Sequence, residues 1–342
     1  MEISLLGTGL LGAAIGERLL ACGHRLTVWN RTPKRCMPLL ALGARAAASP
    51  AEAVATGELV ITVLNDGPTT SSVLLEQAGM ALAGKLVLQV ATIAPGESID
   101  LAFVLQRRGA SYLETPVLGS RPEALAGCLQ VMVGGEMADL ERAQPVLTAL
   151  GGEPRHLGPV GSALHTKLAL NQLIASLTHS FSLALHMVQQ AGVEVEAFMG
   201  ILRNSALYAP TFDKKLAKEL ADDYSNPNFP TAHLRKDLQL FLTAAAALQL
   251  ETKGLRGLAE LLQGATAAGL DDRLQLPAPA HGHHLDPEGQ RLMNLRSPNR
   301  PAAAGPVPPG PRLRPGLPGI PPPPQAGPCP RSWDWRGDPP GP

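Results

Sequence analysis

The sequence predicts an α/β domain with a doubly wound parallel sheet, followed by an all-α domain and a disordered, proline-rich tail. Before Gly158, short aliphatic runs recur every 20 to 30 residues or so, with helical apolar patterns between them,. This alternation is typical of βαβ units and a parallel sheet. After Gly158 no convincing strand follows, and the apolar residues recur at helical spacing. From Asp271 onward, the last 72 residues hold 20 of the 33 prolines.

Five aliphatic runs in the first part are predicted to form the strands of the sheet. They are Ile3–Leu6, Leu26–Trp29, Leu59–Val63, Leu86–Val90 and Val131–Val133. Because helical patterns separate these runs, we expect the strands to pair in parallel.

Four helices are predicted for the second part, at Leu164–Gln190, Glu194–Arg203, Thr231–Leu248 and Gly254–Ala268. The first is long and largely apolar, so it must bury more than one face. It does so either inside its own domain or against a second subunit.

The segment from Asp271 differs in composition from the rest of the chain. Pro and Gly fill 29 of its 72 positions, and such a segment buries too little apolar surface to offset its ordering entropy. We expect disorder, either as a lineage-specific extension or as translation in a shifted reading frame. His281, His283 and His284 cluster there, but no metal site is predicted. The expected domains are 1–160, 161–270 and 271–342.

Charge and cysteine content exclude several classes of protein. The 29 basic side chains balance 29 acidic ones, so no positive field favours nucleic acid. No apolar run reaches the eighteen or so residues that a bilayer crossing needs, which predicts a soluble protein with no membrane partner. The four cysteines contain no CxxC pair, which argues against a disulfide framework or thiolate zinc site. With a strand already at Ile3, no signal peptide is expected, and the predicted location is cytoplasmic.

A glycine-rich turn follows the first predicted strand directly and opens a helix over Leu10–Ala21. In this context the GxGxxG spacing is a strong signal for a dinucleotide pyrophosphate, held at the positive end of the helix. The sequence therefore predicts a Rossmann-type domain. Its expected cofactor-binding residues are Gly7, Thr8, Gly9, Leu10, Leu11 and Gly12.

The second strand ends in Asn30, Arg31 and Thr32, where an NAD-binding protein usually has a carboxylate for the ribose 2′-hydroxyl. A guanidinium and a hydroxyl there, with Lys34 and Arg35 one turn on, suit a 2′-phosphate,. NADP (NADPH) is therefore the predicted cofactor. The alternative is that Arg31 and Lys34 are charges on a solvated loop edge.

Several motifs in order resemble the β-hydroxyacid dehydrogenases, and within them most closely the glyoxylate/succinic semialdehyde reductase branch. The resemblance covers about residues 1 to 270. It implies NADPH-dependent reduction of a small carboxylate substrate, an aldehyde or keto acid, as a homodimer or homotetramer. The segments that carry it are Gly7–Gly12, Gly23–Thr32, Glu114–Ala124, Met132–Gly135 and Gly158–Lys167.

The resemblance implies that Lys167 is the catalytic proton donor, with Asn171 one helical turn further on the same face. The chemistry needs such a group, because an alkoxide developing on the substrate must receive a proton as hydride arrives. A partly desolvated lysine has its pKa lowered toward the working range. His165 is expected to face elsewhere and to be structural.

The family's carboxylate-binding turn corresponds to Leu118, Gly119 and Ser120, but Leu118 stands where the family has a serine. That hydroxyl is lost, and we expect the N–H groups of Gly119 and Ser120 to form an anion nest instead.

Other site residues follow from the resemblance. Leu64, Asn65 and Asp66 are expected along the cofactor groove, and Thr92 near the nicotinamide or, alternatively, as a helix N-cap. In the closing segment, Lys236 is expected at the cofactor, and Phe229 and Asp237 at the substrate. The alternative is that Phe229 is ordinary core and that the two charged residues are surface charges.

Three other functions stay open. One is oxidation of 3-hydroxyisobutyrate or a related β-hydroxyacid with NAD(P). The second is a non-catalytic, cofactor-binding scaffold, favoured by Leu118 and the unusual C-terminal segment and opposed by Lys167 and Asn171. An imine reductase is less favoured, since that related group usually lacks the lysine.

Overall fold

The computed structural model describes residues 1–221, 224 and 229–271. Residues 272–342 of the predicted tail (271–342), with His281, His283 and His284, lie outside the described residues.

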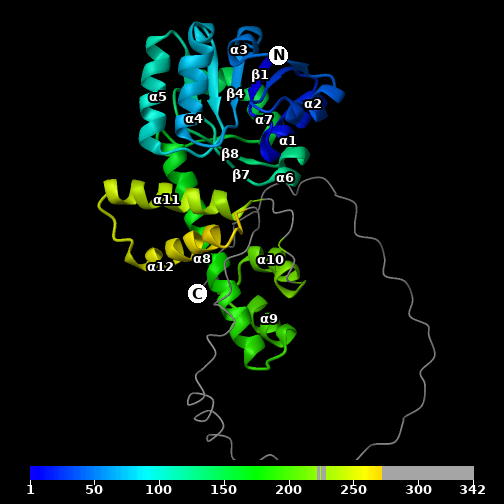
Figure 1. Ribbon diagram of the computed structural model, residues 1–342, viewed down its shortest axis with the longest axis vertical. Helices are drawn as coiled ribbons and strands as arrows, with labels where there is room; N and C mark the ends of the chain where they lie inside the picture. The colour runs from blue at the N-terminus through cyan, green and yellow to red at the C-terminus, as the bar shows by residue number, and fades with distance from the viewer. Residues whose placement is uncertain (222–223, 225–228, 272–342) are drawn as a thin grey trace, which may run out of the picture. The chain divides into compact units, whose positions relative to one another are not determined.

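A six-stranded parallel sheet forms the core of the N-terminal part (Figure 1). Its order is β3-β2-β1-β4-β5-β6, and all five neighbouring pairs are parallel. The chain winds outward in both directions from β1 and β4, which places a topological switch point between these two strands. The predicted α/β class is confirmed. The strands are β1 (Glu2–Leu6), β2 (Arg25–Trp29), β3 (Arg45–Ala46), β4 (Leu59–Thr62), β5 (Leu86–Gln89) and β6 (Ser111–Glu114).

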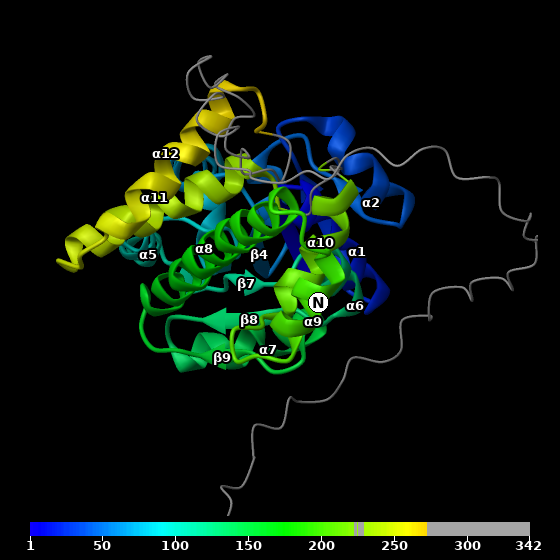
Figure 2. The ribbon, with the colours of Figure 1, turned by 90° about the horizontal axis from the view of Figure 1, so that it is seen from below.

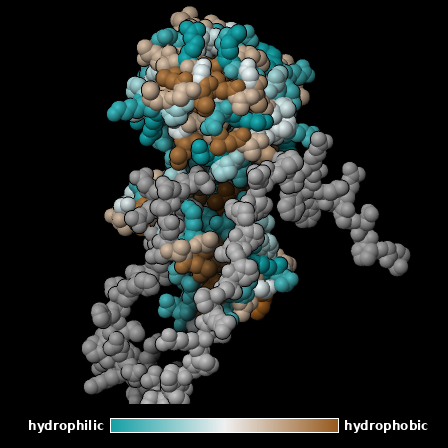
Figure 3. Space-filling model, turned by 90° about the vertical axis from the view of Figure 1, so that its right-hand side faces the viewer, coloured by the Kyte–Doolittle hydropathy of each residue, from teal (hydrophilic) through white to brown (hydrophobic). Residues whose placement is uncertain are grey.

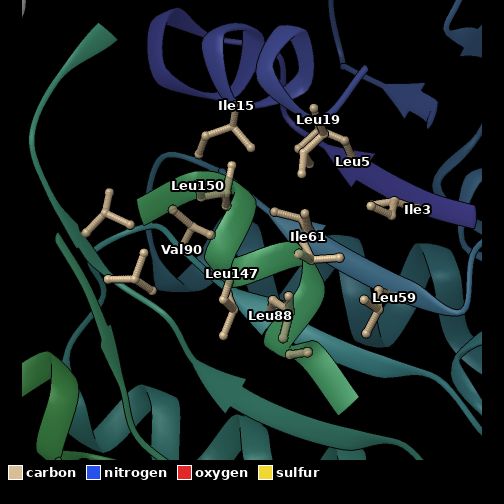
Figure 4. Packing of buried hydrophobic residues seen from close by; sticks show 14 of the residues in the cluster. Ile3, Leu5, Ile15, Leu19, Leu59, Ile61, Leu88, Val90, Leu147 and Leu150 are labelled. Atoms are coloured by element: carbon tan, nitrogen blue, oxygen red, sulfur yellow. The ribbon is translucent and has the colours of Figure 1, made fainter. Parts of the chain in front are cut away.

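Helices cover both faces of the sheet because successive strand residues point to opposite sides. Leu5 of β1 packs in one apolar cluster with α1 and α7, including Ile15 and Leu150 (Figure 4). Its neighbour Leu6 packs in the other cluster, with residues such as Leu101 of α5. The helices of this part are α1 (Leu10–Ala21), α2 (Met37–Ala41), α3 (Pro50–Thr56), α4 (Gly67–Ser71), α5 (Pro95–Arg107), α6 (Arg121–Ala126) and α7 (Met137–Gly151).

The prediction that Val131–Val133 belongs to the parallel sheet is wrong. These residues lie in β8 (Gln130–Val133), the middle strand of a second sheet between β7 (Val117–Leu118) and β9 (Arg155–His156). Strand β8 is antiparallel to β7, and the Met132 N–H donates to the Pro116 carbonyl (3.0 Å). The sequence-based prediction also missed β6, whose apolar run, Tyr112 and Leu113, is only two residues long. Pairing with β5 defines that strand.

The predicted all-α domain is confirmed for the described part of the chain after residue 160. Its helices are α8 (Ser162–Gln190), α9 (Val195–Arg203), α10 (Pro210–Ala221), α11 (Thr231–Ala247) and α12 (Lys253–Ala267). Helix α8 packs against α11 and α12 through a cluster with Leu234 and Leu262 (Figure 2). Helix α10 was not predicted, because its sequence is highly charged; Phe212 anchors it by stacking on Phe181 of α8 (4.9 Å between ring centroids).

Helix α8 is long and apolar enough, by length and composition alone, to cross a membrane, and one third of its most apolar window is buried. The expectation that no apolar stretch has that length therefore needs this correction. A core helix of a soluble protein meets the same test. Several of its large apolar side chains are exposed, including Leu173, Leu183 and Met187, and apolar surface is visible among the helices in Figure 3.

Candidate functional site

The three glycines of the turn after β1 have different structural roles. A Cβ on Gly7, whose φ is +101°, would lie 2.3 Å from the Val63 carbonyl oxygen, and one on Gly12 would lie 2.1 Å from the Gly7 carbonyl oxygen. Gly9, the N-cap of α1, faces open space and provides no side-chain cap. Since the first turn of α1 also has no acidic residue, its N–H groups are placed to bind an anion such as a pyrophosphate.

The side chains of the other residues of the turn differ in exposure. The Thr8 side chain is buried, and its hydroxyl lies 3.7 Å from the Cys36 sulfur. Leu11 packs on the core, and Leu10 is exposed.

The loop after β2 is exposed and basic. Asn30 Oδ1 accepts a hydrogen bond from the Thr32 N–H (2.9 Å), which closes a tight turn that carries Arg31. Lys34 and Arg35 follow, also exposed, in a short 3₁₀ helix (Pro33–Cys36). This geometry is compatible with a bound phosphate.

The loop after β4 lies next to the glycine turn. A Cβ on Gly7 would also meet the Leu64 side chain. Asp66 caps α4 through the Thr69 N–H and accepts from Asn65 Nδ2, both at 2.8 Å. Partial burial opposes ionisation of Asp66, but these hydrogen bonds and the charge of Lys236 lower its pKa overall.

A pocket of about 440 Å³ joins this loop to the C-terminal helices. Lys236 lines it, and its Nζ donates to the Thr92 carbonyl oxygen (2.6 Å) and forms an ion pair with Asp237 Oδ1 (2.9 Å). Helix α5 has Ala94 as its N-cap, so the alternative of Thr92 as N-cap is wrong. The pocket is lined by Asn65, Asp66, Ala232, His233, Arg235, Lys236, Gln239, Leu240, Ala259, Leu262 and Gln263.

Lys167 lies on the second turn of α8, and Asn171 one turn further on. Burial lowers the pKa of Lys167 from 10.5 to about 8; Asp237 opposes this shift, and Lys236 adds to it. Asn171 is 2% exposed, and its Nδ2 donates to Asp237 Oδ2 (2.5 Å). The Asn171 Oδ1 atom is buried and has no hydrogen-bond partner within the part of the chain that the structure describes. Lys167, Asn171, Lys236 and Asp237 are thus brought together from two helices.

Phe229 packs against the cluster between α8, α11 and α12, and its ring is tilted against His233 (6.1 Å between centroids). This packing favours the core role over the substrate role, which stays a prediction.

The predicted anion nest at the substrate turn needs correction. Ser120 donates both its N–H (2.9 Å) and its hydroxyl (2.8 Å) to Glu123 Oε2, as the N-cap of α6. Gly119 has φ +129°, and Leu118 ends β7. Because Glu123 already occupies the Ser120 donors, a substrate carboxylate reaches them only if that capping box opens.

Glu114, at the end of β6, was not singled out from the sequence. This fully buried carboxylate accepts from the N–H groups of Gly161 (2.7 Å) and Leu164 (3.3 Å) and so caps the helix that carries Lys167. Burial raises its pKa despite these hydrogen bonds. Because Glu114 ends a strand that the sequence did not predict, no local signal marked it. His165 Nδ1 bonds the Gly161 carbonyl (2.7 Å), as expected for a structural role.

The sheet, its glycine turn and the lysine on α8 define a nicotinamide-dinucleotide oxidoreductase fold. Residues 2–158 match the family model for the NAD binding domain of 6-phosphogluconate dehydrogenase. Residues 161–275 match the model described as NAD-binding of NADP-dependent 3-hydroxyisobutyrate dehydrogenase.

Within the residues that the structure describes, no group of three or more His, Cys, Asp or Glu is placed to hold a metal ion.

Individual relatives agree with these models. Glyoxylate/succinic semialdehyde reductase 1 of Arabidopsis thaliana is 30% identical over 275 residues, which cover 80% of this chain and 95% of the relative. The structure of Mycobacterium tuberculosis 3-hydroxyisobutyrate dehydrogenase with L-serine superposes with a TM-score of 0.73 at 25% identity, covering 80% and 95% of the two chains. The cytokine-like nuclear factor N-PAC of Homo sapiens is 28% identical over 274 residues, 79% of this chain and 49% of that protein. The chain belongs to the 3-hydroxyisobutyrate dehydrogenase family of NAD(P)-binding oxidoreductases.

Proposed function

We propose that this protein is an NADPH-dependent reductase that converts small aldehyde or keto acids, such as glyoxylate and succinic semialdehyde, into hydroxyacids. The observation that carries the proposal is the placement of Lys167, whose pKa is lowered to about 8 by burial. A chain of contacts leads from its neighbour Asn171 through Asp237 and Lys236 to Thr92 and to the pocket beside the β4–α4 loop. The name of the Arabidopsis relative supports the substrate class.

The residues of the glycine turn fit a dinucleotide, since Gly9 leaves room at an uncapped helix start. NADPH held at this turn would supply the hydride that reduces the carbonyl carbon. The Lys167 ammonium gives its proton to the carbonyl oxygen, which gains the C=O π electron pair in this reduction. Its amine then takes up a proton from water. Asn171 Oδ1, which has no hydrogen-bond partner among the described residues, is an acceptor for the ammonium or for the product hydroxyl.

The loop after β2 supports the proposed preference for NADP. No carboxylate is present between Asn30 and Cys36, and three basic side chains are exposed there. The description of the second matching family model, an NADP-dependent enzyme, points the same way. We place the 2′-phosphate against Arg31 and Thr32.

Replacing Arg31 with alanine is expected to weaken NADPH binding by about ten- to a hundredfold, because charge-assisted hydrogen bonds contribute about 1.5–3 kcal/mol. NADH binding is expected to change little. Titration of both cofactors by fluorescence measures the effect. Arg107→Ala, an exposed arginine at the end of α5, is the matched control. An equal loss of affinity for NADPH and NADH would contradict the placement of the 2′-phosphate against Arg31.

The pH dependence of reduction follows from the pKa of Lys167. The ammonium is the active form, so kcat/KM for the aldehyde is expected to be flat at neutral pH. It then falls about tenfold per pH unit above the pKa of about 8,. Oxidation of the hydroxyacid requires the amine and is expected to rise over the same range. Stopped assays in both directions across pH 6 to 10 or so test this, and parallel profiles in the two directions would disprove the role.

The exposed apolar side chains of α8 support a homo-oligomer, which we propose as a dimer or tetramer. Leu173, Leu183 and Met187 lie on one helix and are each at least half exposed, an arrangement that favours burial against a second copy. We also propose that the protein is cytoplasmic. Light scattering of the purified chain tests the oligomeric state.

Two other functions have observations in their favour. Oxidation of 3-hydroxyisobutyrate or a similar β-hydroxyacid uses the same groups in reverse and is supported by the Mycobacterium tuberculosis relative. A non-catalytic scaffold is supported by the engaged Ser120 donors and by the N-PAC relative, whose name is not that of an enzyme. Turnover in either direction rules out the scaffold.

A further inference from the structure

Asp237 is placed where it contacts the site's other residues but hardly contacts solvent. The residue is 2% exposed, as is Asn171. Its Oδ2 accepts the Asn171 Nδ2 hydrogen bond (2.5 Å), and its Oδ1 pairs with Lys236 Nζ (2.9 Å). Oδ2 is therefore hydrogen-bonded, whereas Oδ1 is balanced by the Lys236 charge but has no hydrogen-bond partner among the described residues.

The Asp237 carboxylate fixes the orientation of the Asn171 side chain. An ionised carboxylate accepts hydrogen bonds and donates none, so only the NH₂ end of the amide can face it. The Asn171 Oδ1 atom is then turned away from Asp237, and it is buried with no partner among the described residues. A buried acceptor without a partner is costly, which is expected where a ligand or a reacting proton completes the site.

We propose that Asp237 is a positioning residue, which orients the Asn171 amide and balances Lys236 beside the Lys167 amine. The proposal rests on the proposed function and assigns a new role at the same site. Lys236 ties this arrangement to the nucleotide-binding domain, because its Nζ also donates to the Thr92 carbonyl.

The charged groups around Lys167 come from α11. Asp237 favours its ammonium form, and Lys236 disfavours it. Asp66, on the β4–α4 loop, lies close enough to interact with Lys236, and His165 on α8 bonds Gly161 at the helix start. Removing Asp237 and removing Lys236 are therefore expected to move the Lys167 titration in opposite directions, which a merely structural role would not produce.

The test measures the Lys167 amine directly. Acetylation rates of Lys167 with acetic anhydride are followed against pH by peptide mass spectrometry, in the full chain without substrate. The wild-type midpoint is expected near 8, that of Asp237→Asn lower and that of Lys236→Met higher. Asp213→Asn, which removes a carboxylate that pairs with Arg203 on the remote α9–α10 segment, is the control and is expected to match wild type.

Measurements of kcat test whether Asp237 acts through Asn171. Asp237→Asn is expected to lower kcat about tenfold, because either end of the Asn171 amide can then face position 237. Asn171→Ala in the Asp237→Asn background is expected to add almost no further loss. Full additivity of the two losses would overturn the positioning role.

The two proposals fail in different ways. If the acetylation midpoint of Lys167 in Asp237→Asn stays at the wild-type value or rises, the positioning role is overturned, even in an active enzyme. If Asp237→Asn does not fold, the acetylation midpoint of Lys167 in Lys236→Met is the deciding measurement. An upward shift of that midpoint supports the proposal, and an unchanged midpoint overturns it. The acetylation midpoints of the two variants could also shift in opposite directions while the wild-type chain reduces no aldehyde acid. This result would refute the proposed function and still support the charge arrangement around Lys167.

Discussion

Replacing Lys167 with methionine is expected to lower kcat for aldehyde reduction by about a hundred- to ten-thousand-fold, the usual contribution of a positioned general acid. The affinity for NADPH is expected to stay nearly unchanged. Methionine fills most of the volume of the lysine stem, so the packing of α8 against α11 persists. Burying a charged amine costs free energy, so its removal does not lower the free energy of unfolding. Steady-state kinetics and a cofactor titration on the same preparation measure the two quantities.

Lys253→Met is the matched control, because Lys253 begins α12 and its side chain is 73% exposed in a pair with Glu251. It is expected to retain wild-type turnover. Wild-type activity in Lys167→Met would remove Lys167 from the mechanism, and equal losses in both variants would point to general instability.

The second large effect is expected at the glycine turn. Gly12→Ala places a Cβ 2.1 Å from the Gly7 carbonyl oxygen, a backbone atom that cannot move without displacing the strand-to-helix turn. Overpacking of this kind costs about 1–3 kcal/mol of unfolding free energy. Both the melting temperature and NADPH binding are therefore expected to fall.

Gly9→Ala separates cofactor binding from folding. Gly9 has φ −72° and open space around its Cβ position, so alanine fits without strain and the melting temperature is expected to hold. The added methyl group points to where the phosphate approaches the backbone, and NADPH affinity is expected to fall at least tenfold or so. Calorimetry for binding and thermal unfolding for stability measure the contrast. Unchanged affinity in Gly9→Ala would mean that the cofactor binds elsewhere.

Contiguous motifs made much of the fold predictable. The glycine turn, β1 and α1 lie within 20 residues, and each has its own local signal. The lysine on α8 was found through a resemblance that also runs along one continuous segment, Gly158–Lys167. Strand β6 and helix α10 were missed, because both depend on contacts with distant segments. Strand β6 pairs with β5, and α10 is held by the stacking of Phe212 on Phe181 and by packing of Leu216 in the same cluster.

The arrangement within the site was not predictable from one sequence. Asn171 and Asp237 are 66 residues apart, and Lys236 and Thr92 are 144 apart. Residue types indicate that these groups carry chemistry, but only the packing of α8 and α11 shows that Asp237 faces Asn171. At the substrate turn, Glu123 lies three residues after Ser120 in a capping-box pattern,. That local signal would have shown that the Ser120 donors are engaged.

The most direct test of the central claim is NADPH oxidation by the full chain in the presence of glyoxylate or succinic semialdehyde, followed by absorbance. The account predicts turnover of at least one of these aldehyde acids with NADPH, abolished in Lys167→Met and preserved in Lys253→Met. NADPH binding without oxidation by either substrate, in a folded chain, would contradict it.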